Sequence, residues 1–272
     1  MRLIFNLFKF KILEKIYSFQ EIKNDELNEI DIIIPTITKD FDSLLKVVTS
    51  TRYIAQRINK IYIISNSNNK IINFCLKNNL VFIDEKSIFN FDKNHIKYKV
   101  GDIDRSGWLF QQLIKLNGDK ITEKENFLVL DSDTIFIRRI TFFKDNKTIF
   151  YYGKEWHWPY HQTNKKLINY KIVKYYSFVN HLMMFNKIKL LKLKSEIERK
   201  TKCKWYDAII QEAKKTKEIS FFSEFELYSQ WFLNHYKNES LIKPLFNSKV
   251  TFDNINKIDI SKKHTISYHS YQ

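Results

Sequence analysis

The sequence has few of the residues that make chains flexible or cross-linked. Its 272 residues include four Gly, three Pro and two Cys. So little Gly and Pro leaves little material for disordered linkers, and a hydrophobic fraction of 44% with 16% aromatic residues argues against extensive disorder. Cys75 and Cys203 stand far apart and lack the paired spacing of a zinc site. We therefore expect a reducing compartment, no metal–thiolate role, and two ordinary core cysteines.

The sequence also lacks the run of roughly 18 apolar residues that a membrane-spanning helix needs. Residues 1–17 are apolar and basic, but Lys9, Lys11, Glu14 and Lys15 interrupt them. No small-residue cleavage site follows, so we do not expect a signal peptide. Two interpretations stay open, an amphipathic helix on a membrane face and a helix packed on the domain. We expect residues 1–29 to form an N-terminal amphipathic segment and residues 30–272 a single domain.

Positive charge, in contrast, is abundant. The formal net charge is +16, and the lysines are spread along the whole chain. Evenly spread charge is typical of a solvated surface, so we expect no dedicated nucleic-acid groove. A non-enzymatic, basic protein that binds a membrane surface or nucleic acid stays open as an alternative.

Apolar periodicity predicts alternating strands and helices in the first part of the chain. Strands are predicted at residues 30–36, 60–65 and 80–85, with helices at 41–57 and near 71–76 between them. Further on, the pattern predicts helices at 105–116 and 222–235 and a strand at 148–152. This order is typical of an α/β protein with a mainly parallel sheet flanked by helices. Ligands of such sheets bind beyond the carboxyl ends of the strands, so residues 35–36, 65–66, 84–85 and 131–133 are predicted to line one crevice.

The most informative segment is a predicted strand at residues 126–130 that is followed by Asp131, Ser132 and Asp133. Residues i and i+2 of a strand face the same side, so the two carboxylates are predicted to converge. They repel each other unless one keeps its proton or a cation lies between them. Carboxylate ligands suit Mg²⁺ or Mn²⁺. Two enzyme classes use such a pair: haloacid-dehalogenase-like phosphatases, with Asp131 as nucleophile, and nucleotide-sugar glycosyltransferases.

The phosphatase motif normally lies on the first strand of its domain, whereas three predicted strands precede it here. An ordered set of motifs resembles a poorly characterised group of bacterial and viral polysaccharide-gene proteins with a GT-A-like glycosyltransferase fold. The resemblance spans about residues 31–236. It rests on Arg105-x-Gly-Trp108-x-x-Gln-Gln112-x-x-Lys115-Leu116, Asp131-Ser-Asp-Thr134 with Phe136, Glu155-x-His157, Ser177-Phe178, His181 and Ser223-Glu-x-Glu-Leu-Tyr228.

The resemblance implies a GT-A-like, Rossmann-like fold and transfer of a sugar from a nucleotide-sugar donor to a glycan or glycolipid hydroxyl. Mn²⁺ or Mg²⁺ would be the cofactor, held by Asp133 and by Asp131, which otherwise faces the ribose. A third ligand from near the C-terminus is implied, for which His269 is the candidate and a tail histidine without a role is the alternative. The implied nucleotide-sugar-binding residues are Pro35, Thr36, Asp84, Arg105, Trp108, Gln112, Asp131 and Ser132.

An inverting transferase also needs a base for the acceptor hydroxyl. Glu224 and Glu226, at the start of a late predicted helix that Ser223 is expected to cap, are the candidates. A packing or helix-surface role is the alternative for Glu226. Trp156, Trp158 and Tyr160 suit sugar stacking, although aromatic clusters are more often core. We expect the protein to act in the cytoplasm, with peripheral association at the inner membrane face as an alternative, and not on nucleic acid.

Overall fold

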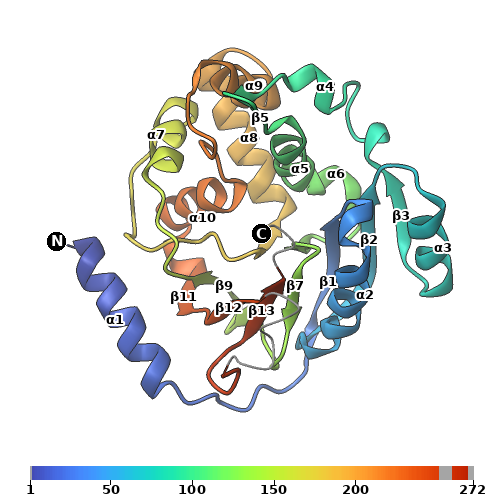
Figure 1. The fold of residues 1–272 in the computed structure, drawn as a ribbon. Coiled ribbons are helices and arrows are strands. Elements are labelled where there is room, and N and C mark those ends of the chain that lie inside the picture. Colours follow the sequence, from blue (N-terminus) through green and yellow to red (C-terminus); the bar gives the residue numbers. More distant parts are fainter. Residues whose placement is uncertain (1, 251–258, 269–272) are drawn as a thin grey trace.

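The computed structural model describes residues 2–250 and 259–268, and its centre is a five-stranded sheet in the order β10-β6-β1-β2-β3 (Figure 1). Four neighbouring strands are parallel, and β10 pairs antiparallel with β6 at one edge. The predicted α/β class with a mainly parallel sheet is therefore confirmed. The strands are β1 (Asp25–Pro35), β2 (Gln56–Ser65), β3 (Val81–Asp84), β6 (Asn126–Leu130) and β10 (Leu182–Asn186).

Helices cover both faces of this sheet. Alternate residues of β1 point to opposite sides, with Ile32 and Ile34 in one core cluster and Ile33 in the other. The first cluster includes side chains of α2 (Phe41–Ser50) and α3 (Asn69–Lys77). The second includes side chains of α5 (Ser106–Leu116), α8 (Lys187–Thr201), α9 (Trp205–Lys215) and α10 (Glu224–His235). Strands buried on both faces explain the continuous apolar runs in the sequence.

The predicted alternation of strands and helices is confirmed, but one helix is shorter than predicted. The helix expected over residues 41–57 ends at Ser50, and a 3₁₀ turn follows at Thr51–Tyr53. The hydroxyls of Ser50 and Thr51 donate to the carbonyls of Val47 and Val48, at 2.8 and 2.7 Å. Such local side-chain bonds compete with helix continuation. Residues 56 and 57 already belong to β2.

Smaller elements complete the fold. The strand β7 (Thr134–Phe136) pairs with β13 (Thr265–Tyr268), which pairs with β12 (Asn247–Val250). A second small sheet contains β8 (Phe143–Lys144), β9 (Lys147–Tyr152) and β11 (Ser240–Pro244), and a third contains β4 (Lys99–Val100) and β5 (Ile103–Asp104). Short helices α4 (Lys93–Ile96) and α6 (Gly118–Ile121) flank α5, and α7 (Trp158–Leu167) follows β9.

The N-terminal helix α1 (Arg2–Ile16) lies along the outside of the domain at the left of Figure 1. Phe10 is buried against the rings of Tyr152 and Phe246, and the Asn6 amide donates to the Tyr175 carbonyl at 2.9 Å. The strand β1 begins at Asp25 rather than at residue 30, so the end of the predicted N-terminal segment belongs to the sheet.

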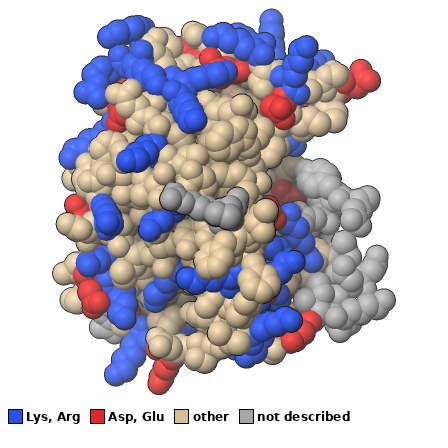
Figure 2. All heavy atoms as spheres, turned by 90° about the vertical axis from the view of Figure 1, so that its left-hand side faces the viewer, with Lys and Arg blue, Asp and Glu red and all other residues tan. Residues whose placement is uncertain are grey.

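Lys and Arg side chains are scattered over the face that Figure 2 shows. None of the described helices combines the length and the apolar character that crossing a membrane requires. Cys75 lies in the core, as predicted, whereas Cys203 is half-buried and packs against the core from outside.

Candidate active site

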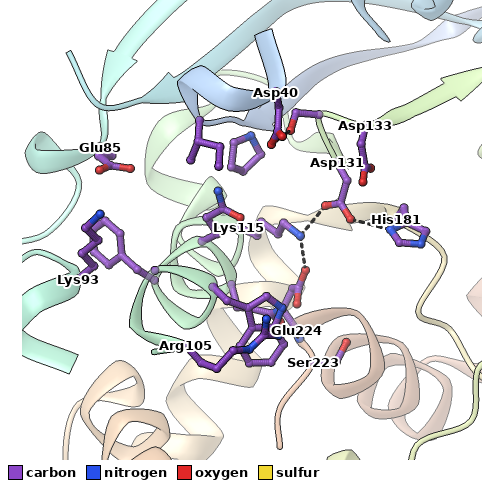
Figure 3. A pocket seen from close by; sticks show the side chains of 18 of the residues that line it. Asp40, Glu85, Lys93, Arg105, Lys115, Asp131, Asp133, His181, Ser223 and Glu224 are labelled. Carbon is purple, nitrogen blue, oxygen red and sulfur yellow. Dashed lines mark hydrogen bonds and ion pairs between the residues drawn. The ribbon is translucent and has the colours of Figure 1, made fainter. Parts of the chain in front are cut away.

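A cleft with a volume of about 770 Å³ opens at the carboxyl ends of the parallel strands. The cleft is lined by Pro35 from the end of β1, Asn66 and Glu85 from just beyond β2 and β3, and residues 131–133 beyond β6. All four strand ends predicted to share one crevice therefore contribute to it. Its opposite wall comes from α5 and the start of α10 (Figure 3).

The loop after β6 brings Asp131 and Asp133 together in a different way from the predicted one. The strand ends at Leu130, residues 131–133 form a turn, and β7 begins at Thr134. The Thr134 amide donates to the Asp131 carbonyl at 3.2 Å, which closes the turn. The strand alternation inferred from the sequence is thus wrong, because the chain leaves the central sheet here to pair with β13. The turn still directs both carboxylates to one point.

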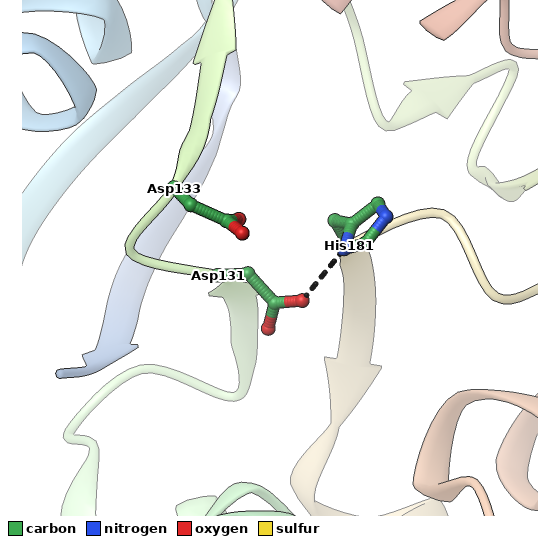
Figure 4. A group of neighbouring side chains, drawn as sticks. All are labelled: Asp131, Asp133 and His181. Carbon is green, nitrogen blue, oxygen red and sulfur yellow. Dashed lines mark hydrogen bonds and ion pairs between the residues drawn. The ribbon is translucent and has the colours of Figure 1, made fainter. Parts of the chain in front are cut away.

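His181 completes this cluster (Figure 4). Ligand atoms of Asp131, Asp133 and His181 all lie within 4.8 Å of one another, and His181 Nδ1 is 3.0 Å from Asp131 Oδ2. The histidine precedes β10, and its carbonyl accepts the Asp131 amide at 2.9 Å, so the antiparallel β6–β10 pair sets its position. Its φ of 63° lies in the left-handed region, which is uncommon for a residue with a Cβ. Backbone strain of this kind gathers at functional sites.

A buried lysine joins this cluster to α10. Lys115 Nζ is 2.6 Å from Asp131 Oδ1 and 2.9 Å from Glu224 Oε1 (Figure 3). Burial alone would lower the pKa of Lys115, but the two carboxylate charges outweigh it and raise that pKa. The ammonium is therefore charged and holds Asp131 and Glu224 in place.

The carboxylates of the cluster differ in their affinity for protons. Burial would raise the pKa of Asp131, but Lys115 and His181 hold it well below its usual range. Burial, together with the charge of Asp131, raises the pKa of Asp133 to about 6. Asp131 is therefore a stable anion with two cationic partners. Within the described part of the chain, Asp133 forms no ion pair of its own. A bound cation would satisfy it.

The structure also fixes the surroundings of Glu224. Ser223 is the N-cap of α10 and accepts the Glu226 amide at 3.3 Å, as predicted for a capping serine. The Gln112 side chain accepts the Glu224 amide at 3.2 Å. Glu224 is almost fully buried, which raises its pKa even though Lys115 opposes the shift. Among the described residues, its Oε2 atom has no hydrogen-bond partner.

Most of the predicted site residues lie at this cleft, and some do not. Pro35, Arg105, Trp108, Gln112, Asp131, Ser132, Asp133 and Glu224 line it. Thr36 is buried behind it, with its amide bonded to the Ile64 carbonyl at 2.8 Å. Asp84 caps a 3₁₀ turn by accepting the Lys86 amide at 3.0 Å, and its neighbour Glu85 lines the cleft instead. His269 lies outside the described residues.

Glu226 faces the interior rather than the cleft. Its carboxylate accepts the Phe178 amide at 3.0 Å and the Gln230 side-chain amide at 2.9 Å. Of the three aromatic residues considered for sugar stacking, Tyr160 lines the cleft. Trp156 stacks on His161 with ring centroids 4.0 Å apart, and Trp158 is about half exposed.

Sequence reasoning assigned no role to two residues that the structure places at the centre of the site. Lys115 and His181 belong to the motifs that carry the resemblance, but neither was a candidate. A signal for Lys115 was present, because it lies seven positions after Trp108 and three after Gln112 and therefore shares their helix face. Asp40 and Lys93 also line the cleft and were missed, and Glu85 was expected at the crevice only as part of a strand end, without a role.

The fold and this site define an α/β protein with a carboxylate-rich cleft at the carboxyl edge of a parallel sheet. The chain belongs to a family of unknown function, DUF6492, whose model matches residues 27–269. No curated protein matches the sequence.

The solved structures similar to this chain include two glycosyltransferases. One is mouse xyloside xylosyltransferase 1 in its apo form, at 10% sequence identity and a TM-score of 0.44, covering 88% of this chain and 97% of that one. The other is the galactosyltransferase LgtC in complex with donor and acceptor sugar analogues. It has 12% identity and a TM-score of 0.46, and the match covers 88% of this chain and 87% of that one.

Proposed function

We propose that the protein is a metal-dependent glycosyltransferase that moves a sugar from a nucleotide-sugar donor to a hydroxyl of a glycan or glycolipid. The observation that supports this most is the cluster of Asp131, Asp133 and His181 at the carboxyl edge of a parallel sheet. It lies in a cleft that also holds the cationic side chains Lys39, Lys93 and Arg105. Carboxylates next to cations suit a diphosphate that binds together with a divalent ion.

The chemistry of the donor set fits such an ion. Asp133 and Asp131 would hold it, with His181 as a ligand or as the partner that orients Asp131. Two carboxylates with an imidazole favour Mn²⁺ over Mg²⁺, which prefers oxygen ligands. When bound, the ion would supply electrostatic stabilisation of the departing nucleoside diphosphate.

The remaining cleft residues suit the rest of the donor. The volume of about 770 Å³ lies within the usual range for small-molecule sites. Arg105 lies over the Trp108 ring at 4.5 Å and donates to the Ile219 carbonyl at 3.1 Å, so its guanidinium is held in a defined position. We assign the nucleotide to the side of the cleft with Pro35, Glu85 and Trp108. Thr36 and Asp84 would then support this wall from behind.

Glu224 is our candidate for the group that accepts the acceptor proton. It lines the cleft, and Lys115 holds its Oε1 atom while its buried Oε2 atom has no hydrogen-bond partner among the described residues. Glu226, in contrast, is occupied by the Phe178 and Gln230 amides. Burial makes Glu224 a better base than an exposed carboxylate, because it raises the pKa.

A second cavity suits the acceptor. It has a volume of about 310 Å³ and shares Val179 and His181 with the donor cleft. Asn180, Asn247 and Ser248 line it and offer hydrogen-bonding groups to sugar hydroxyls. An acceptor bound there would approach the metal cluster past His181. We propose that this reaction takes place in the cytoplasm, at the inner face of a membrane when the acceptor is a glycolipid.

Nucleotide binding tests the proposal most directly. We expect Mn²⁺ together with one or more nucleoside diphosphates to raise the melting temperature of the wild-type protein, and Asp133→Asn to abolish the metal-dependent part. The matched control is Asp102→Asn, an exposed aspartate outside the cleft, which we expect to behave as wild type. Nucleotide binding that survives in Asp133→Asn would show that the metal assignment is wrong.

The same proteins separate transfer from phosphate hydrolysis. A phosphatase with Asp131 as nucleophile would release phosphate from a generic aryl phosphate and lose this activity in Asp131→Asn. Both Asp131 oxygens are already engaged, by Lys115 at 2.6 Å and His181 at 3.0 Å. We therefore expect no turnover of an aryl phosphate by the wild-type protein, and the opposite result would favour the phosphatase.

A further inference from the structure

The helix α1 has two apolar faces, although it packs on the domain with only one. Phe10 and Leu13 contact the core. On the other side, five large apolar residues are exposed, among them Phe5 at 65%, Phe8 at 62% and Ile16 at 70%; the other two are Ile4 and Ile12. At 3.6 residues per turn these five fall within an arc of about 120°. A contiguous exposed apolar stripe is uncommon on a soluble surface and indicates an interaction site.

The charges around the stripe restrict what can cover it. Lys9 and Lys11 are exposed and flank the stripe on its two sides, and Lys15 is exposed within the stripe near the C-terminal end of the helix. The one acidic residue between positions 3 and 16 is Glu14, which is turned toward the domain and paired with Lys263 at 2.5 Å. The exposed side of α1 is therefore mainly apolar, with positive charge along both edges and near its C-terminal end. An anionic lipid surface has the matching composition, with acyl chains beneath negative headgroups.

A second copy of the chain fits this face less well. Two-fold packing through the same stripe would bring the lysines of both helices together without acidic partners. A transmembrane orientation does not fit either, because a helix of 15 residues is about 22 Å long and falls short of the bilayer core.

We propose that the exposed stripe of α1 docks the protein on an anionic membrane surface, with the helix lying flat in the headgroup layer. The face of the molecule that surrounds this helix, shown in Figure 2, carries further Lys and Arg side chains that add to the attraction. Docking in this orientation has a consequence for the acceptor cavity, because Phe10 and Glu14 of α1 form part of its wall. If the proposed transferase function holds, the cavity opens close to the bilayer and suits an acceptor anchored in lipid.

Vesicle co-sedimentation of the full-length protein, without nucleotide or sugar, tests the docking independently of catalysis. We expect the wild-type protein to pellet with vesicles of phosphatidylcholine mixed with phosphatidylglycerol and much less with pure phosphatidylcholine. Phe5→Ser/Phe8→Ser should lower the partition coefficient by about tenfold or more. The control Leu76→Ser changes an apolar side chain that is 75% exposed on α3 and should bind as wild type.

Charge variants and a measurement of the oligomeric state complete the test. Replacing Lys9, Lys11 or Lys15 by Gln should weaken binding to the anionic vesicles by about fivefold per lysine and reduce its dependence on salt. Circular dichroism shows whether each variant is folded, and Ile12→Glu/Ile16→Glu serves if the phenylalanine variant is not. The proposal would be overturned if the wild-type protein did not bind anionic vesicles. It would also be overturned if the protein were a dimer that Phe5→Ser/Phe8→Ser dissociates and no vesicle binding were found.

Discussion

Two buried lysines of this protein occupy contrasting surroundings. Lys194 of α8 pairs with Asp119 of α6, and both side chains are almost completely enclosed. Lys115 of α5 is equally buried, but it contacts two carboxylates, Asp131 and Glu224, at the edge of the cleft. The first cluster balances one positive charge with one negative charge. The second sets Lys115 and His181 against three carboxylates, those of Asp131, Asp133 and Glu224.

The pKa values follow this difference. For Lys194, burial outweighs the attraction of Asp119 and lowers the pKa to about 8. For Lys115, two carboxylates overcome burial and raise the pKa. An enclosed ion pair with balanced charges connects two helices. A cluster beside a cleft with more carboxylates than cations is stabilised by binding a further cation. The comparison thus separates a structural ion pair from a site, although both contain the same kinds of residue.

The largest effect that this comparison predicts is on activity. Lys115→Met removes the charge that holds Asp131 and Glu224. Asp131, on the metal side of the site, and Glu224, the proposed base, then lose their fixed positions. We expect kcat/KM for sugar transfer to fall by about 100-fold or more. Initial rates with a donor and acceptor identified from the nucleotide screen give the measurement, and circular dichroism confirms the fold. A kcat/KM value within about threefold of wild type would contradict a role for Lys115 in the site.

Lys194→Met should act on stability instead. It leaves Asp119 buried without its partner, which typically costs about 3–5 kcal/mol in the free energy of unfolding. Urea denaturation measures this change, while kcat/KM per folded molecule should remain as in wild type. Adding Asp119→Leu removes the unpaired charge and should recover most of the lost stability. A double variant as unstable as Lys194→Met alone would show that this pair contributes more than charge balance.

The sequence predicted the parts of the fold that depend on local patterns. The alternation through β1, α2, β2, α3 and β3 is visible because apolar periodicity and turn residues act over a few positions. The turn at residues 131–133 was not predictable in this way. It depends on β7 pairing with β13, whose partner residues are more than 100 positions away in the chain.

Prediction of the site from the sequence is limited in the same way. The carboxylates at the strand ends were found because parallel strands bring their carboxyl ends together. The position of His181 depends on the antiparallel pairing of β10 with β6, which the local pattern does not show. Glu224 and Glu226 are two positions apart on a helix and so point about 200° apart. Which of them faces the cleft depends on how α10 packs, and its own sequence pattern leaves that open.

The smallest predicted effect extends the comparison to these two glutamates and concerns pH. Burial raises the pKa of Glu226 from 4.5 to about 7, so the folded state favours its protonated form. A raised pKa of this kind gives stability below pH 4.5 that is lost as the pH rises through about 7. The size of this loss is roughly 3 kcal/mol, since each pKa unit corresponds to about 1.4 kcal/mol. His161, whose Nε2 is 3.9 Å from the Glu226 carboxylate, has its pKa lowered to about 4 by burial and offers little charge to oppose it.

Glu226→Gln removes this titration and resembles the protonated side chain. Relative to wild type, the variant should therefore be about as stable at pH 4 and should gain on wild type by up to roughly 3 kcal/mol by pH 8. Urea midpoints at both pH values measure the change, and Glu218→Gln, which alters an exposed glutamate, is the control. The corresponding change at Glu224 should instead lower kcat/KM, because that carboxylate faces the cleft. If stability changed with pH in the same way in wild type and Glu226→Gln, the Glu226 carboxyl would not titrate in this range. The two glutamates would then differ only in that Glu224 faces the cleft.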